Sequence, residues 1–131
     1  MIRFACVTVD AADPYELAHW WAGATGWAVE EGAQAGDDQV MLQAPGAPGQ
    51  PDVLFLRVPE GKSVKNRLHF DVEAAPGGSR DAEVERLVKL GAVPYEDHRA
   101  AEGGKGWMTL LDPEGNEFCI CSNEAERAVT G

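Results

Sequence analysis

The chain has 131 residues, 44% of them hydrophobic, and a formal net charge of −11 at pH 7. This length is typical of one domain, and the apolar fraction is sufficient for a packed core. The acidic balance disfavours nucleic acid and anionic membranes as partners, because both are bound through basic patches. No apolar run approaches the roughly 20 residues that cross a bilayer, so we expect no membrane partner.

The N-terminal residues 1–9 alternate between apolar and polar as a strand does. They lack the long apolar centre of a secretory signal, so we expect a cytoplasmic protein. Three cysteines, an odd number, argue against a disulfide framework. Cys119 and Cys121 stand two apart on one predicted strand, where a bridge between them would be strained. We therefore expect all three thiols to be reduced.

The first half of the chain predicts a strand, a helix and three more strands. The first strand covers Arg3 to Val9. A helix follows, because Asp13 is a good N-cap, Pro14 suits the first helical position, and Gly26 suits the end. The later strands are predicted at 27–30, 39–43 and 53–58.

The second half repeats this order. The segment Val9-Asp10-Ala11-Ala12 recurs as Val72-Glu73-Ala74-Ala75, at the end of a strand predicted over 67–72. A helix is predicted from Ser79 to Leu90, with Arg80 among the side chains that face water. Strands are predicted at 93–96, 107–111 and 117–121. The pattern favours an α+β fold of two βαβββ modules and eight strands, with one face of each sheet free to line a cavity.

A turn at Asp112-Pro-Glu-Gly-Asn116 joins the last two strands. Pro113 presets the φ of a type I turn, and Gly115 tolerates positive φ as the chain reverses. On the return strand, Phe118 and Ile120 share one face and read as core. Cys119 shares the opposite face with the residues two positions on either side of it.

Three motifs resemble one family: Lys65-Asn-Arg-Leu-His-Phe-Asp71, Leu90-Gly-Ala92 and Asp112-Pro-Glu-Gly-Asn-Glu-Phe118. Together with the doubled order, they resemble the bacterial glyoxalase-like branch of the vicinal oxygen chelate superfamily, which includes glyoxalase I, bleomycin-resistance proteins and extradiol dioxygenases. The resemblance implies one domain over 1–131, with module one at about 1–60, module two at about 65–122 and a C-terminal tail at 123–131. It implies an eight-stranded cupped sheet around a pocket, with helices outside, and a homodimer.

In metal-dependent members, the resemblance implies a divalent ion held by His, Gln or Glu from the first and last strands of each module. The matching places here fall on Phe4, on Arg67 with His69 two residues later, on Leu54 or Leu56, and on Cys119. A hard ion needs oxygen ligands, and these places offer one imidazole and one thiol. We therefore expect no metal cofactor and no glyoxalase I activity. An alternative is a zinc site at Cys6, His69, Cys119 and Cys121.

Seven residues are predicted to contact a ligand: Arg67, His69, Trp107, Cys119, Phe4, Cys6 and Leu56. His69 is a candidate general base, or a structural histidine bonded to Asp71. Arg67 is a candidate to stabilise an oxyanion, or to form a salt bridge with Asp71 or Glu117. Trp107 ends a Gly-rich loop and could flank a planar or cationic ligand. The two remaining histidines, at positions 19 and 98, are interpreted as solvated.

These observations predict a glyoxalase-like domain that binds a small organic molecule in the cavity between its modules, or converts it without a metal. One alternative is sequestration of a cationic drug, as in bleomycin-resistance proteins, which the net charge of −11 favours. A second alternative is a divalent-metal-dependent lyase, isomerase or dioxygenase.

Overall fold

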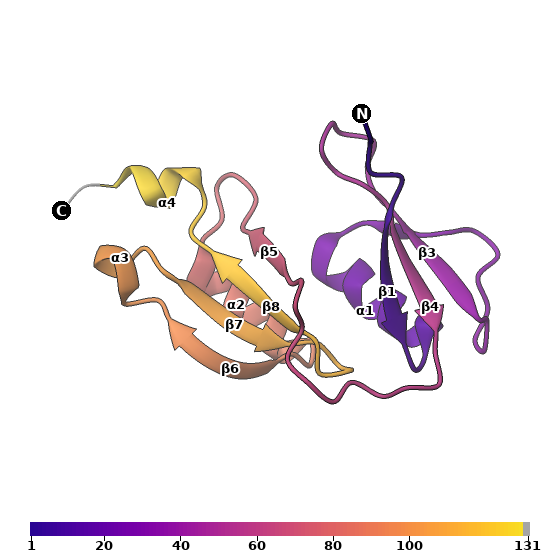
Figure 1. The fold of residues 1–131 in the computed structure, drawn as a ribbon. Helices are drawn as coiled ribbons and strands as arrows, with labels where there is room; N and C mark the ends of the chain where they lie inside the picture. The colour runs from indigo at the N-terminus through magenta and orange to yellow at the C-terminus, as the bar shows by residue number, and fades with distance from the viewer. Residues whose placement is uncertain (130–131) are drawn as a thin grey trace. The chain divides into compact units, whose positions relative to one another are not determined.

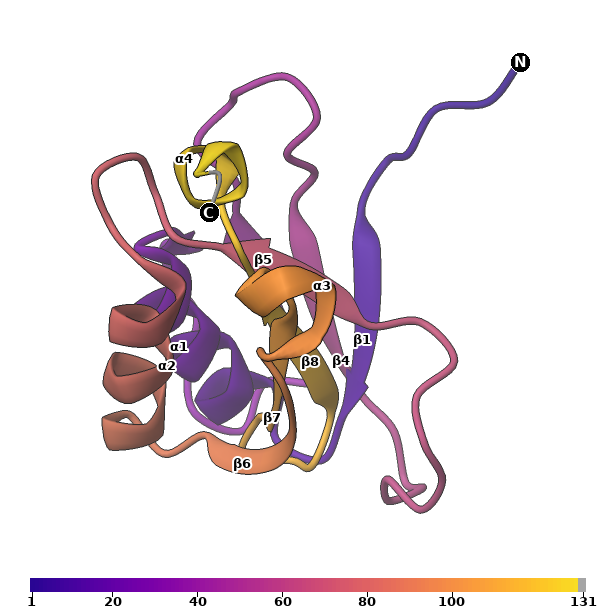
Figure 2. The same cartoon turned by 90° about the vertical axis from the view of Figure 1, so that its left-hand side faces the viewer.

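The computed structural model describes residues 1–129 and divides into two compact units, Met1–Gly61 and the residues from Lys62 onward. Each unit holds a four-stranded sheet with a helix against one face (Figures 1 and 2). This confirms the predicted α+β fold of two βαβββ modules with eight strands. Among the described residues, no helix has the length and apolar character needed to span a bilayer.

The first unit contains β1 (Val7–Ala11), α1 (Pro14–Thr25), β2 (Ala28–Val29), β3 (Gln39–Gln43) and β4 (Val53–Arg57), with strand order β1-β4-β3-β2. The predicted caps of α1 are confirmed. The Asp13 carboxylate accepts a hydrogen bond from the Glu16 backbone N–H at 3.3 Å, and Gly26 ends the helix with φ of 77°. The core between α1 and the sheet contains Leu17, Trp21, Val40, Leu42 and Phe55.

The first strand starts later than predicted. The sequence favoured Arg3, but β1 begins at Val7, which pairs with Val53 at the start of the parallel strand β4. Pro51, just before β4, has no N–H to donate to a continued ladder. Phe4 therefore lies outside the sheet, with 86% of its surface exposed.

The second unit contains β5 (Phe70–Glu73), α2 (Arg80–Lys89), β6 (Val93–His98), α3 (Ala101–Gly104), β7 (Trp107–Leu111), β8 (Glu117–Cys121) and α4 (Glu124–Ala128). The strand order is β5-β8-β7-β6, with β5 and β8 parallel and the other neighbours antiparallel. Helix α2 lies against one face of this sheet, while α3 and α4 lie at one end of it (Figures 1 and 2).

The alternation predicted for β8 is confirmed. Phe118 and Ile120 are each 1% exposed, and they form the core with Val84 and Leu87 of α2. Full burial of one such side chain stabilises the fold by about 1.5–3 kcal/mol. This packing fixes which face of β8 turns away from α2.

The predicted turn that orients β8 is also confirmed. The Asp112 carboxylate accepts hydrogen bonds from the backbone N–H groups of Glu114 and Asn116, at 2.9 and 3.0 Å. Gly115 has φ of 84° and donates its N–H to the Asp112 carbonyl at 2.9 Å. These bonds hold the chain reversal that the motif predicted.

Several boundaries in the second unit differ from the sequence prediction. Strand β5 begins at Phe70, not at Arg67, because its partner β8 begins only one residue before the paired Phe118. Strand β6 continues to His98, two residues beyond its predicted end at Glu96. Helix α4 lies in the segment interpreted as a tail, of which positions 130–131 fall outside the described residues. Arg80, predicted to face water, is only 9% exposed.

Candidate functional site

A pocket of about 400 Å³ is built entirely from the second unit. All four strands of the sheet contribute to it, through side chains that alternate with those of the core. The lining residues are Lys65, His69, Asp71, Tyr95, Glu96, His98, Trp107, Thr109, Glu117, Cys119 and Cys121. The pocket thus lies on the face of the sheet opposite the core, where we predicted that a cavity could form.

A row of polar side chains crosses the pocket. The strand register pairs Asp71 with Cys119, Cys119 with Thr109, and Thr109 with Glu96. Three spacings of about 4.8 Å separate the outer strands, so the backbones of the two carboxylate residues lie about 14 Å apart. The pocket therefore has two ends, each with a carboxylate, and a thiol and a hydroxyl between them.

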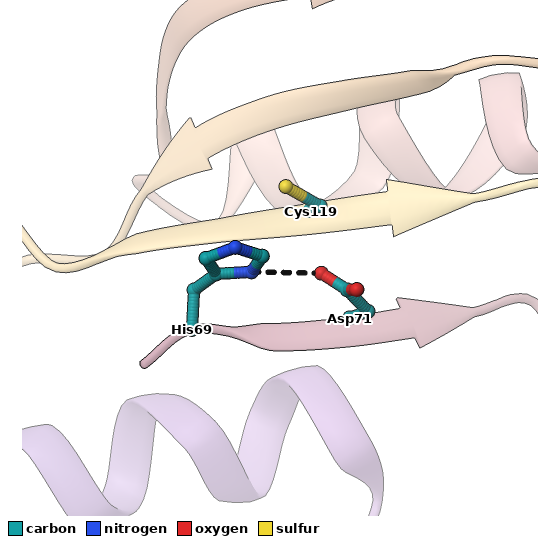
Figure 3. Close-up of side chains that lie close together, drawn as sticks. All are labelled: His69, Asp71 and Cys119. Atoms are coloured by element: carbon teal, nitrogen blue, oxygen red, sulfur yellow. Dashed lines mark hydrogen bonds and ion pairs between the residues drawn. The ribbon is translucent and has the colours of Figure 1, made fainter. Parts of the chain in front are cut away.

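The β5 end of the pocket holds an imidazole–carboxylate pair. His69 Nδ1 lies 2.9 Å from Asp71 Oδ1, and Figure 3 shows the ring between β5 and β8. Both side chains remain accessible, with 38% and 58% exposed. Because a carboxylate accepts hydrogen bonds, the neutral ring carries its proton on Nδ1 and leaves Nε2 as an acceptor. This is the orientation that a general base or a ligand-binding imidazole requires.

The thiol beside this pair is buried. Cys119 is 7% exposed, and its Sγ lies 3.4 Å from the Thr109 hydroxyl. Burial raises the pKa of the Cys119 thiol, and the nearby Asp71 carboxylate raises it further. Burial also raises the pKa of Cys121. Both side chains are therefore neutral thiols near pH 7, and neither is an activated nucleophile.

The β6 end of the pocket is aromatic. The rings of His98 and Trp107 stack with centroids 4.8 Å apart and an angle of 27°. His98 Nε2 lies 2.9 Å from the Glu96 carboxylate, so this end has a second imidazole–carboxylate pair. A bulge between Pro94 and Glu96 shifts the register and allows neighbouring residues of β6 to line the pocket.

A partly buried salt bridge involves Glu117 at the edge of the pocket. Lys62 Nζ lies 3.1 Å from Glu117 Oε1, and the Asn66 N–H donates to Oε2 at 2.9 Å. Burial alone would raise the pKa of Glu117, but the bonds from Asn66 and Lys62 outweigh it and lower the pKa. The partner of Glu117 is therefore Lys62, and not the Arg67 proposed from the sequence. The bridge ties residues 62–66 to the start of β8.

The structure brings together three of the seven predicted site residues: His69, Trp107 and Cys119. Arg67 is exposed and is not part of the pocket lining. Phe4, Cys6 and Leu56 lie in the first unit, so their contact with a ligand stays a prediction.

Sequence reasoning missed part of the lining. His98 was interpreted as solvated, yet it stacks on Trp107 and lines the pocket. The signal was available, since alternation along an extended β6 places His98 and Glu96 on one face. The predicted strand ended at Glu96, which hid this relationship.

Three side chains offer ligand atoms for a metal ion. One ligand atom each from His69, Asp71 and Cys119 lies within 4.8 Å of the others. A nitrogen, an oxygen and a sulfur donor suit Zn²⁺, which binds imidazole, carboxylate and thiolate. A hard ion such as Mg²⁺ does not fit, because it takes oxygen ligands and the set contains one carboxylate.

Comparisons with known proteins agree with this fold. The model of the family described as Glyoxalase-like domain matches residues 6–121. The fosfomycin resistance protein FosX from Listeria monocytogenes is 13% identical, with 99% of this chain and 100% of that chain covered and a TM-score of 0.70. The hypothetical protein SA1046 from S. aureus is 16% identical, with coverages of 94% and 95% and a TM-score of 0.69.

A glyoxalase-related enzyme from Fulvimarina pelagi is 17% identical, with coverages of 94% and 89% and a TM-score of 0.68. Identities of this size show a shared fold. No match was found among curated proteins.

Proposed function

Because the chain belongs to the glyoxalase-like domain family of the vicinal oxygen chelate superfamily, we propose that it binds a small planar organic molecule in the pocket of its second module. The observation that carries the proposal is the pocket itself. Its volume of about 400 Å³ lies within the range of small-molecule sites. It combines polar groups at one end with an aromatic wall at the other, which is how such sites orient a ligand.

We expect each end of the pocket to recognise a different part of the ligand. At the β6 end, Trp107 and His98 are stacked, and we expect a planar ligand to lie on the free face of this pair. Aromatic contacts of this kind contribute about 0.5–1.5 kcal/mol beyond simple burial. At the β5 end, His69 Nε2 accepts a hydrogen bond from the ligand, with its ring held by Asp71. A ligand that reaches both ends must span most of the sheet.

Conversion of the ligand would use the same groups without a metal. His69 Nε2 would accept a proton from a carbon next to a carbonyl, and Asp71 would stabilise the resulting imidazolium. The electron pair of the broken C–H bond would move onto the carbonyl oxygen, forming an enolate. Lys65 lines the pocket, and we propose that it would neutralise that oxygen, a role predicted from the sequence for Arg67.

The charge of the pocket favours a neutral or cationic ligand. Asp71 and Glu96 are both about half exposed, and each keeps one carboxylate oxygen beyond the one that bonds its histidine. Glu117 is paired with Lys62, so the lining contributes these two further carboxylates and one lysine, Lys65. This supports the alternative of sequestering a cationic drug.

The charge of the pocket also bears on whether this chain could take an anionic phosphonate. A mutant of the Listeria FosX is described as complexed with Mn(II) and a dihydroxypropylphosphonic acid. An anionic phosphonate would meet the Asp71 and Glu96 carboxylates in the present pocket, at a cost in Coulomb energy. We therefore propose that this chain does not take a phosphonate.

A zinc-dependent activity is the second candidate, supported by the donor set of His69, Asp71 and Cys119. Bound zinc would polarise an oxygen of the ligand as a Lewis acid. The test is a Co²⁺ titration, because thiolate ligation produces charge-transfer absorption. This candidate predicts a band that is absent in Cys119→Ser and retained in Cys121→Ser. No band in the wild-type protein would exclude it.

The proposed binding is tested with three probes that share one ring: tryptamine, indole and indole-3-acetate. The chain has three histidines, so ¹³C-detected imidazole resonances report on each pocket end separately. His19, on α1 and bonded to the Tyr15 carbonyl, is the internal control. We expect His69 and His98 to shift with tryptamine most strongly and with indole-3-acetate least. The absence of shifts at both would overturn the proposal.

A further inference from the structure

We propose that Arg80, on α2 and outside the pocket, is a positioning residue that holds the aromatic wall formed by Trp107 and His98. Its effect on ligand affinity rests on the proposed function. Its effect on the position of the His98 ring does not. The two can therefore fail separately.

The Arg80 side chain binds the segment that leads into Trp107. Its Nη1 donates to the carbonyl oxygens of Gly104 and Gly106, at 3.1 and 2.9 Å, and the guanidinium is buried. Gly106 is the residue directly before Trp107. A planar, always-charged guanidinium holds two carbonyls in a fixed geometry that a lysine ammonium does not reproduce.

A chain of alternating charges extends from Arg80 to the other side of the wall. Arg80 Nε lies 3.0 Å from Asp81, Arg99 Nη1 lies 3.4 Å from Asp81, and Arg99 Nη2 lies 2.7 Å from Asp97. Asp97 and Arg99 flank His98 in the sequence. The hydrogen bonds from Arg99 lower the pKa of Asp97, and the bond from Arg80 lowers that of Asp81, as expected for paired carboxylates.

The backbones of His98, at the end of β6, and Gly106, just before β7, also touch directly. A Cβ atom added to Gly106 would lie 1.9 Å from the His98 carbonyl oxygen, so the backbones are in close contact. A displacement of Gly106 must therefore displace His98. Through this contact, the bond between Arg80 and Gly106 bears on both rings of the stack.

Helix α4 fixes the position of Arg80 in turn. The Glu126 carboxylate accepts the Arg80 backbone N–H at 3.1 and 3.2 Å, and it also accepts the Asn123 N–H at 3.1 Å. Lys105, in the same loop, donates to the Arg127 carbonyl at 3.1 Å. Helix α4, in the segment interpreted from the sequence as a tail, thus holds Arg80 and the loop before Trp107 in place.

The test is Arg80→Lys in the full chain, read by the imidazole resonances without any ligand. Stacking on Trp107 displaces the His98 ring protons upfield. We expect Arg80→Lys to reduce that displacement and to leave His19 and His69 unchanged. The matched control is Arg86→Lys on the same helix, because the Arg86 guanidinium pairs with Glu83. It should leave all three histidines unchanged.

An unchanged His98 in folded Arg80→Lys would overturn the proposal. If that variant does not fold, Asp81→Asn carries the test, because Asp81 is a half-exposed link of the same chain. It should move His98 in the same direction by a smaller amount, and no movement would overturn the proposal. If tryptamine binds the wild type, its Kd should rise about 2- to 10-fold in Arg80→Lys. This rise corresponds to the loss of one aromatic contact.

Discussion

His69 Nδ1 and Asp71 Oδ1 lie 2.9 Å apart, whereas at the other end of the pocket it is Nε2 of His98 that meets the Glu96 carboxylate. The two neutral imidazoles therefore hold their protons on different nitrogens. His69 presents Nε2 as an acceptor, and His98 keeps Nδ1 for that role.

This relationship predicts the tautomers. At a pH where both rings are neutral, long-range ¹H–¹⁵N spectra should show His69 protonated on Nδ1 and His98 on Nε2. In Asp71→Asn, the amide can donate to Nδ1, so the proton of His69 should move to Nε2, while His98 should not change. A His69 that keeps its tautomer in Asp71→Asn would mean that Asp71 does not orient the ring.

The buried thiol predicts a fall in stability at alkaline pH. Burial raises the pKa of Cys119, so the folded state holds this proton at pH values where the unfolded chain loses it. The stabilisation is complete below about pH 8.5, the ordinary value in an unfolded chain, and is lost as pH rises through the folded value. Urea denaturation between pH 7 and pH 10 should show a shallower decline in Cys119→Ala. Equal slopes would contradict this.

Glu117 predicts the opposite dependence in acid. Its pKa is lowered, since the bonds from Asn66 and Lys62 outweigh the effect of burial. Its contribution is present above the unfolded value of about 4.3 and is lost as pH falls through the lower, folded value. Stability measured at pH 3 and pH 6 should therefore differ less in Glu117→Gln than in wild type. If stability differs equally between the two pH values in both proteins, the ion pair between Glu117 and Lys62 does not contribute to the pH dependence of stability.

The close contact at Gly106 predicts a steric cost. Because an added Cβ would lie 1.9 Å from the His98 carbonyl, Gly106→Ala should destabilise the fold by about 1–3 kcal/mol, as overpacking does. It should also perturb the His98 resonances. Gly61→Ala is the control, since an added Cβ there meets nothing within 4 Å. Equal unfolding free energies for the two variants would refute the expectation.

The sequence predicted the fold wherever local chemistry decides it. Asp13 and Gly26 bound α1, the Asp112 turn reverses the chain, and the alternation of Phe118 and Ile120 orients β8. Each of these depends on neighbours a few residues apart, so a single sequence contains the information.

The rest depends on partners far apart in the chain. The strand β1 begins at Val7 because of its pairing with Val53, and Arg80 is buried because of carbonyls more than twenty residues away. The same holds for the site. His69, Trp107 and Cys119 were found from motifs and alternation, whereas His98 was missed because the pairing of β6 with β7 extends the strand two residues beyond its predicted end.

We propose that a planar ligand lies between His69 and the Trp107 wall. The most direct measurement is a set of intermolecular nuclear Overhauser effects between the ring protons of tryptamine and the side chains of the 131-residue chain. We expect contacts to both Trp107 and His69, and none to His19. Saturable binding with contacts only to residues outside the pocket lining would contradict it.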